Sequence, residues 1–179
     1  MVTTGSAVVL VEGESDRRAV LTLAPRLGVP VPEVVVMHGI TNLRAHLAAR
    51  HGAVLLLHDA AETTWVGRVL TDTTRPDLQV ATFVCDVDLE DELVRAVGVR
   101  GVLAVVVEQG ERAAYERMAQ QPAQRDRTDA QRLRRWLGAR SGHKTTYAGL
   151  LAGAVPLDRV PVPLRSLLAA ADAHDQAAT

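Results

Sequence analysis

Short apolar runs that alternate with helix-forming segments restrict the fold of this chain more than any other feature of its sequence. Five runs are rich in Val, Leu and other apolar residues: 6–11, 33–37, 53–58, 79–85 and 102–107. Helical patterns lie between them, at about 16–27, 41–50, 62–73 and 89–97. The runs are continuous, as strands buried on both faces should be. This alternation predicts an α/β fold with a central parallel sheet and helices on both faces, because right-handed crossovers place the helices there.

The later part of the chain shows helical patterns only, over residues 110–120, 128–139 and 144–154. The last segment begins with prolines, which break helices, then offers one short apolar helix and closes in small residues that we expect to be mobile. With 179 residues, of which 47% are apolar, the chain is long enough for one core. We predict one domain over residues 1–155 that includes a helical C-terminal extension, then a Pro-containing tail with a short helix over 156–179.

The sequence lacks signals for a membrane or for secretion. No run of about 18 or more apolar residues could cross a bilayer, and the N-terminus lacks the basic start and cleavage site of a signal peptide. Cys85 is the only cysteine, which excludes an internal disulfide and a zinc site built from several cysteines. These features predict a cytoplasmic protein that makes no membrane contact.

Charge is segregated along the chain, although the net charge is only −1. The segment 124–144 contains seven Arg or Lys residues against two Asp, a local balance of +5 that leaves −6 for the rest. This basic segment lies within the predicted helical extension. We therefore expect basic and acidic functions in different parts of the molecule.

Acidic residues follow three of the predicted strands. Glu12 and Asp16 follow the first run, and Asp59 and Glu62 follow the third. After the fourth run come Asp86, Asp88, Glu90, Asp91 and Glu92. Parallel strands end at one edge of a sheet, where open α/β folds bind ligands, so these carboxylates should converge. Their mutual repulsion favours a hard divalent cation with oxygen ligands, Mg²⁺ or Mn²⁺.

Each acid taken singly has a second interpretation as a helix cap. Ser15 or Asp16 could cap the helix that follows the first strand, and Asp88 with Asp91 could cap the helix after the fourth. Short polar side chains satisfy free backbone N–H groups at such positions. The metal site is favoured by the three acidic strand ends together, and by none of them alone.

The stretch VVLVEGESDRRAVLTLAPRLG, residues 8–28, resembles the first motif of the TOPRIM domain in the form carried by the OLD (overcoming lysogenization defect) family nucleases. In that family an apolar strand is followed by V-E-G-x-S-D and a helix. The chain also resembles further OLD-type blocks, in the same order, at HGITNL, LLLHDAAE, CDVDLEDEL and GHKTTYAGLL. The likeness therefore covers about residues 6–153. The resemblance implies a Rossmann-like TOPRIM fold, divalent metal ions and cleavage of nucleic-acid phosphodiesters.

The resemblance also implies roles for individual acids. Glu12 would bind metal or relay a proton, and Asp16 would be a second ligand. Asp59 would be the first aspartate of the second TOPRIM motif, D-x-D, but position 61 is Ala. Either Glu62 substitutes for the missing acid, or the site holds one ion instead of two. After the fourth strand, Glu90 matches an acid of the OLD pattern, with Asp88 as a further candidate ligand.

Lys144 is the only lysine in a chain with 19 arginines, and it lies at the end of the basic segment. A compact ammonium group there could stabilise the negative charge that develops on a phosphate during cleavage. The likeness to a lysine-bearing OLD block points the same way. An ordinary surface lysine is the alternative.

The segment 138–145, GARSGHKT, differs from the phosphate-loop pattern at one position, where His143 replaces Gly. A phosphate loop should follow a buried strand, whereas this segment follows a basic helical stretch, so we expect no ATP site. Long OLD proteins carry a separate N-terminal ATPase, which makes a separate ATPase a candidate partner.

The basic side chains of the extension could track the phosphates of a nucleic acid without reading its sequence. They are Arg132, Arg134, Arg135, Arg140 and Lys144. A solvated helix face is the alternative for the arginines. DNA is favoured over RNA as the partner, and a homodimer is left open.

Together these observations predict a metal-dependent DNA endonuclease or nickase. The alternatives are a non-catalytic TOPRIM adaptor, whose metal site is degenerate because of Ala61, and a phosphate-transfer enzyme that acts on a small nucleotide.

Overall fold

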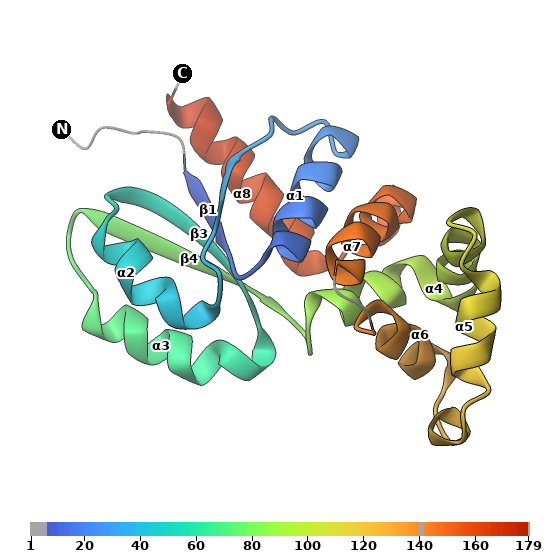
Figure 1. Cartoon of the computed structure of the whole chain (residues 1–179). Helices are drawn as coiled ribbons and strands as arrows, with labels where there is room; N and C mark the ends of the chain where they lie inside the picture. The colour runs from blue at the N-terminus through green and yellow to red at the C-terminus, as the bar shows by residue number, and fades with distance from the viewer. Residues whose placement is uncertain (1–6, 140–141, 179) are drawn as a thin grey trace.

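A parallel β-sheet forms the centre of the molecule (Figure 1). The computed structural model describes residues 7–139 and 142–178. The strands are β1 (Val8–Val11), β2 (Glu33–Val36), β3 (Gly52–Asp59) and β4 (Leu78–Cys85). They lie in the order β2-β1-β3-β4, and all neighbouring strands are parallel. The predicted α/β class and four of the five predicted strands are thereby confirmed.

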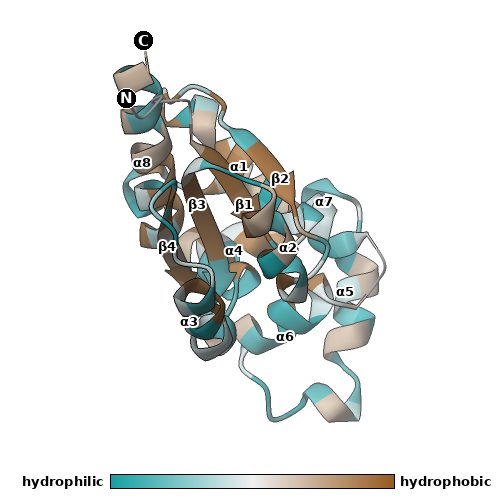
Figure 2. Ribbon diagram, turned by 90° about the vertical axis from the view of Figure 1, so that its left-hand side faces the viewer, coloured by the Kyte–Doolittle hydropathy of each residue, from teal (hydrophilic) through white to brown (hydrophobic). Residues whose placement is uncertain are grey.

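Helices cover both faces of the sheet. On one face lie α1 (Glu14–Arg26), α4 (Leu89–Glu108), α7 (His143–Ala154) and α8 (Val162–Ala178), and on the other lie α2 (Leu43–Ala48) and α3 (Thr63–Asp72). Successive residues of a strand point to opposite faces. In β3, Leu55 and Leu57 therefore pack in the first core, and Leu56 packs in the second. This double burial explains why β1 and β3 are hydrophobic along their length (Figure 2).

The fifth predicted strand, residues 102–107, is wrong. This run forms the second half of α4 (Leu89–Glu108), after a kink at Gly98, which has a φ of 77°. Val102, Val105 and Val106 are buried, whereas Val107 is 49% exposed. That spacing is the spacing of one helix face. A short apolar run fits both a buried strand and a buried helix, so periodicity alone could not distinguish them.

The predicted helical extension is present as α5 (Arg112–Ala119), α6 (Asp129–Leu137) and α7. Figure 1 shows α5 and α6 at the end of the molecule away from the sheet, with α4 leading to them. Short 3₁₀ turns occur at Ile40–Asn42, Ala60–Glu62, Pro122–Gln124 and Leu157–Arg159. An aromatic row joins the helices, in which Trp136 lies edge-on to Tyr115 and to His143, and His143 in turn lies against Tyr147. Tyr115, Trp136 and Tyr147 belong to the same hydrophobic cluster as the core beside the sheet, so the extension is continuous with that core.

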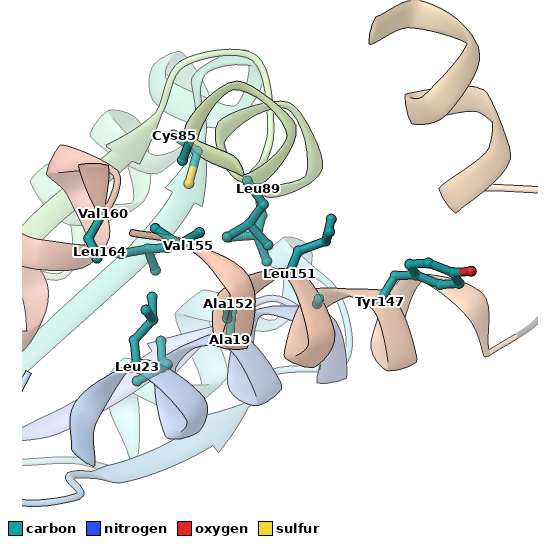
Figure 3. Packing of buried hydrophobic residues seen from close by; sticks show 14 of the residues in the cluster. Ala19, Leu23, Cys85, Leu89, Tyr147, Leu151, Ala152, Val155, Val160 and Leu164 are labelled. Atoms are coloured by element: carbon teal, nitrogen blue, oxygen red, sulfur yellow. The ribbon is translucent and has the colours of Figure 1, made fainter. Parts of the chain in front are cut away.

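The C-terminal helix α8 is longer than predicted and packs against β3 and β4. Leu164, Leu167, Leu168 and Ala171 are buried at helical spacing. Figure 3 shows Leu164 in the same packed cluster as Cys85, Leu89 and Val155. The helix continues to Ala178, where a tail of small residues was expected, and its buried positions end at Ala171. Within the described ranges, no helix has both the length and the apolarity needed to cross a membrane.

Candidate functional site

The end of β1 places the first acids of the candidate site. The strand ends at Val11, and the half-buried Glu12 follows it. Gly13 is the N-cap of α1, and its backbone N–H donates to Asp16 Oδ2 over 2.8 Å. Asp16 therefore does cap the helix, as its simpler interpretation predicted. This bond also fixes the direction of its carboxylate, so the two interpretations of Asp16 are compatible.

Asp59 is the last residue of β3 and is half-buried. The pKa of Asp59 is raised from 3.8 to about 7. Burial is the largest cause, and the negative charges of nearby acids add to it, namely Asp16, Asp88, Glu12 and Glu90. The carboxylates that follow β1, β3 and β4 therefore lie close enough to repel one another. The strands β1, β3 and β4 are parallel, so the acids that follow them lie at the same edge of the sheet.

Asp16 experiences the same crowding. Its pKa is raised from 3.8 to about 6, mainly by burial and then by the charges of Glu90 and Glu12. The Gly13 N–H bond and the positive charge of Lys144 act in the opposite direction. We call Glu12, Asp16, Asp59, Asp88 and Glu90 the acid cluster.

Two members of the acid cluster are paired with cations of the helical extension. Asp88 is the N-cap of α4, where its Oδ1 accepts the Asp91 N–H over 2.9 Å, and its Oδ2 pairs with Arg134. Glu90 is 7% exposed, and its Oε2 lies 3.3 Å from Lys144 Nζ. These two ion pairs connect α6 and α7 to the edge of the sheet.

The other predicted acids lie outside the acid cluster. Arg95 forms ion pairs with Asp86, Asp91 and Glu92, over 3.3, 2.8 and 3.2 Å. These three acids thus share one guanidinium group. Glu62 ends the 3₁₀ turn that follows β3, and among the described residues it forms no ion pair or side-chain hydrogen bond. The role of Glu62 beside Asp59 stays a prediction.

Two histidine contacts lie beside the site, and one of them involves His58, which directly precedes Asp59 in the sequence. His58 is buried, and its Nδ1 lies 2.9 Å from the carbonyl oxygen of Asp59, so this nitrogen acts as the donor. His143 Nε2 lies 3.1 Å from Glu111 Oε1, and the Tyr147 hydroxyl donates to Glu111 Oε2 over 2.5 Å. Because His143 precedes Lys144 at the start of α7, this network holds the lysine-bearing turn in place.

The arginines of the extension differ in their use. The guanidinium of Arg132 donates to the carbonyl oxygens of Gln124 and Arg125, over 3.0 and 3.1 Å, and pairs with Asp129. Arg132 is therefore occupied by the fold of its own segment. Arg134 and Arg135 are exposed on α6. Arg140, also predicted to bind nucleic acid, lies outside the described residues.

The chemistry of the acid cluster suits a hard divalent cation, because every donor is a carboxylate oxygen. Glu12, Asp16 and Asp59 have no basic side-chain partner in the described chain, so they are the members that would hold the ion. Among the described residues, no three His, Cys, Asp or Glu side chains are placed so that they could hold a metal ion. The donors fit Mg²⁺ or Mn²⁺ in chemical type, and the metal site stays a prediction.

These features define a parallel α/β domain with an acidic strand-end edge beside a basic helical extension. The C-terminal region of the Burkholderia pseudomallei OLD protein has this fold, with a TM-score of 0.66 and 20% identity, over 95% of this chain and 97% of that one. One structure of the C-terminal region of the Xanthomonas campestris pv. campestris OLD protein gives a TM-score of 0.67 at 23% identity, over 97% of this chain and 95% of that one. A second structure of the same region gives a TM-score of 0.64 at 24% identity, over 97% of this chain and 98% of that one.

No protein-family model matches the chain, and no curated protein matches it in sequence. The chain has the fold of the C-terminal regions of OLD proteins, and the fold implied by the sequence resemblance is confirmed.

Proposed function

We propose that this protein is a divalent-metal-dependent nuclease that cleaves phosphodiester bonds of DNA. The observation that carries the proposal is the acid cluster, in which burial and then the charges of the neighbouring carboxylates raise the pKa of Asp16 to about 6 and that of Asp59 to about 7. A protein that keeps such repulsion at one edge gains from a cation that relieves it. The shared fold with OLD C-terminal regions supports the same proposal.

Each residue of the site has a role in this proposal. Glu12, Asp16 and Asp59 would hold Mg²⁺ or Mn²⁺, which supplies an activated water and neutralises charge on the phosphate. The Gly13 N–H bond keeps the Asp16 carboxylate oriented. Lys144, whose side chain is 57% exposed, can turn from Glu90 towards a phosphate and offset the negative charge that develops there.

A non-catalytic adaptor is the second candidate. Ala61 stands where the TOPRIM pattern has an acid, and Arg134 and Lys144 already neutralise Asp88 and Glu90. In this function the ion pairs replace the metal, and the protein binds nucleic acid or a partner protein without cutting.

Incubation of the protein with supercoiled plasmid and Mg²⁺ or Mn²⁺ tests the proposal. We expect nicked plasmid with the wild type, and no nicking in EDTA or with Glu12→Gln. Glu33→Gln is the matched control, because Glu33 is an exposed acid at the opposite end of the neighbouring strand. Nicking by Glu12→Gln at the wild-type rate contradicts the nuclease proposal. An intact plasmid with wild type and variant alike, at either metal, favours the adaptor.

A further inference from the structure

A basic groove lies on α6, beside the acid cluster. It has a volume of about 510 Å³ and is lined by Arg127, Gln131, Arg134, Arg135 and Gly138. All five residues are exposed. In the described part of the chain, the side chains of Arg127 and Arg135 form no ion pair or hydrogen bond. Among the described residues, Arg127 and Arg135 thus offer two guanidinium groups without carboxylate partners in one concave surface, which suits an anion.

The fold does not require these arginines, as the contrast with Arg132 shows. Arg132 belongs to the same helix but turns inward, where it binds the carbonyl oxygens of Gln124 and Arg125. Arg127 and Arg135 have no such task, and the groove contains no aromatic side chain on which a base could stack. The chemistry of the groove therefore suits phosphate oxygens, which guanidinium forks bind well, and offers nothing that reads a base by stacking.

Two contacts join the groove to the acid cluster. Arg134 lines the groove and pairs with Asp88 of the cluster. Gly138 lines the groove next to Lys144, so that a β-carbon at position 138 would stand 3.9 Å from Lys144 Cε. Lys144 in turn lies 3.3 Å from Glu90. An extended anion that fills the groove would thus continue directly into the acid cluster.

We propose that the α6 groove binds backbone phosphates of a polynucleotide strand, next to the phosphodiester that lies at the acid cluster. The inference rests on the proposed function and names the surface that would position its DNA strand, a surface that a small nucleotide would leave empty. Contacts of this kind position a strand without reading its sequence. The groove thereby gives the site sequence-independent and salt-sensitive binding.

The test measures binding in EDTA, where cleavage does not interfere. A labelled DNA duplex of about 30 base pairs is titrated at several salt concentrations with wild type, with Arg127→Ala/Arg135→Ala, and with the control Arg100→Ala/Arg117→Ala. The control removes two exposed arginines that lie outside the groove. For the groove variant we expect a slope of log K against log salt that is less steep by about 1.8, with affinity roughly tenfold or more weaker near 0.1 M salt. The control should match the wild type.

Arg127→Lys/Arg135→Lys keeps the charges and should restore most of the slope, which distinguishes lost phosphate contacts from misfolding. The inference is overturned if the groove variant keeps the wild-type affinity and slope, if the control loses as much, or if the wild type does not bind the duplex. Plasmid nicking by a groove variant with unchanged binding would overturn the inference and leave the nuclease intact. Groove-dependent binding without nicking at either metal would support the inference and overturn the nuclease.

Discussion

The acidic edge of the sheet and the basic face of α6 carry opposite charges and are built by different means. The acids of the first region follow strands whose register is fixed by parallel pairing, and they are half-buried or buried. The arginines of the second region stand on an exposed helix face, where long side chains keep their freedom. The first region therefore holds its charges at fixed positions, and the second holds them on side chains that can adapt to a partner.

The two regions meet at two ion pairs, Asp88 with Arg134 and Glu90 with Lys144. Their role differs between the two candidate functions. In a nuclease the pairs hold the acids until metal and phosphate compete for both partners. In an adaptor the ion pairs would persist, because no metal ion replaces Arg134 and Lys144 beside these acids.

The largest expected effect is on the cleavage rate, and it distinguishes the role of the acid cluster from that of the basic groove. Asp59→Asn should lower the rate of plasmid nicking by more than about 100-fold, because a ligand of the ion is lost. DNA binding in EDTA should stay at the wild-type level or become tighter, because one negative charge near the strand is removed. Nicking kinetics measure the cleavage rate, and fluorescence anisotropy measures the affinity for DNA. If Asp59→Asn lost both, the acid cluster and the basic groove would not have separate roles in cleavage and binding.

Lys144 lies between the two regions and should show a mixed effect. Lys144→Ala should reduce the rate at saturating DNA by roughly 10- to 100-fold, since the charge that offsets the developing phosphate charge is gone. Lys144→Arg should recover binding but only part of the rate, because a planar guanidinium fits the same place differently. Equal rates for wild type and Lys144→Ala would make this residue an ordinary surface lysine.

The pH dependence of metal binding should reveal the acid cluster. Asp59, with its pKa raised to about 7, and Asp16, with its pKa raised to about 6, must lose their protons to bind an ion. Affinity for Mn²⁺ should therefore fall by about tenfold or more per pH unit below about pH 6. Calorimetric titrations between about pH 5 and 8 would show it, and an affinity that is flat over this range would contradict the assignment.

The same raised pKa values predict how the metal-free protein unfolds. In the folded state Asp59 keeps its proton up to about pH 7, against an ordinary pKa of 3.8, so its contribution to stability is present below about pH 4 and is lost as the pH rises through 7. Asp59→Asn should remove this loss and stabilise the metal-free protein at about pH 8 by roughly 1–2 kcal/mol, since solvent screens a half-buried carboxylate. Thermal unfolding in EDTA measures it, and the gain should disappear near pH 4.

The smallest expected effect sharpens the comparison within α6. Arg132→Ala should lower the free energy of unfolding by about 1–2 kcal/mol, because two backbone carbonyl groups lose their donor. The salt dependence of DNA binding should not change. Denaturant unfolding measures the change in stability, and DNA titrations at several salt concentrations measure the number of phosphate contacts. A less steep dependence of log K on log salt for this variant would show that Arg132 contacts the DNA, as first predicted.

The sequence predicted the sheet and its acidic edge because both follow from local pattern and parallel topology. Once β1, β3 and β4 are parallel, Glu12, Asp59 and Asp88 must follow their ends at one edge. The run 102–107 was misassigned because its helical burial appears only after α4 packs against its neighbours. Likewise, Arg95 pairs with Asp91 and Glu92 one helix turn away and with Asp86 before the helix, and the strand pattern does not contain these contacts.

The helices of the extension and their basic character were predicted, but the sequence could not show which arginines remain exposed. Which arginine turns inward depends on the loop before α6, where Gln124 and Arg125 present their carbonyl oxygens to Arg132. The contact of Glu111 with His143 joins residues of different helices, and no spacing in the sequence indicates it. Docking between helices depends on side-chain packing, so its polar contacts are found only in the folded molecule.

Titration of the metal-free protein with Mn²⁺ at about pH 8 tests most directly whether the strand-end carboxylates form a cation site. We expect saturable binding of one or two ions by the wild type and by the exposed control Glu33→Gln, and none by Glu12→Gln or Asp59→Asn. Binding that is absent from the wild type, or equal in all four proteins, would contradict the assignment of the acid cluster as the metal centre.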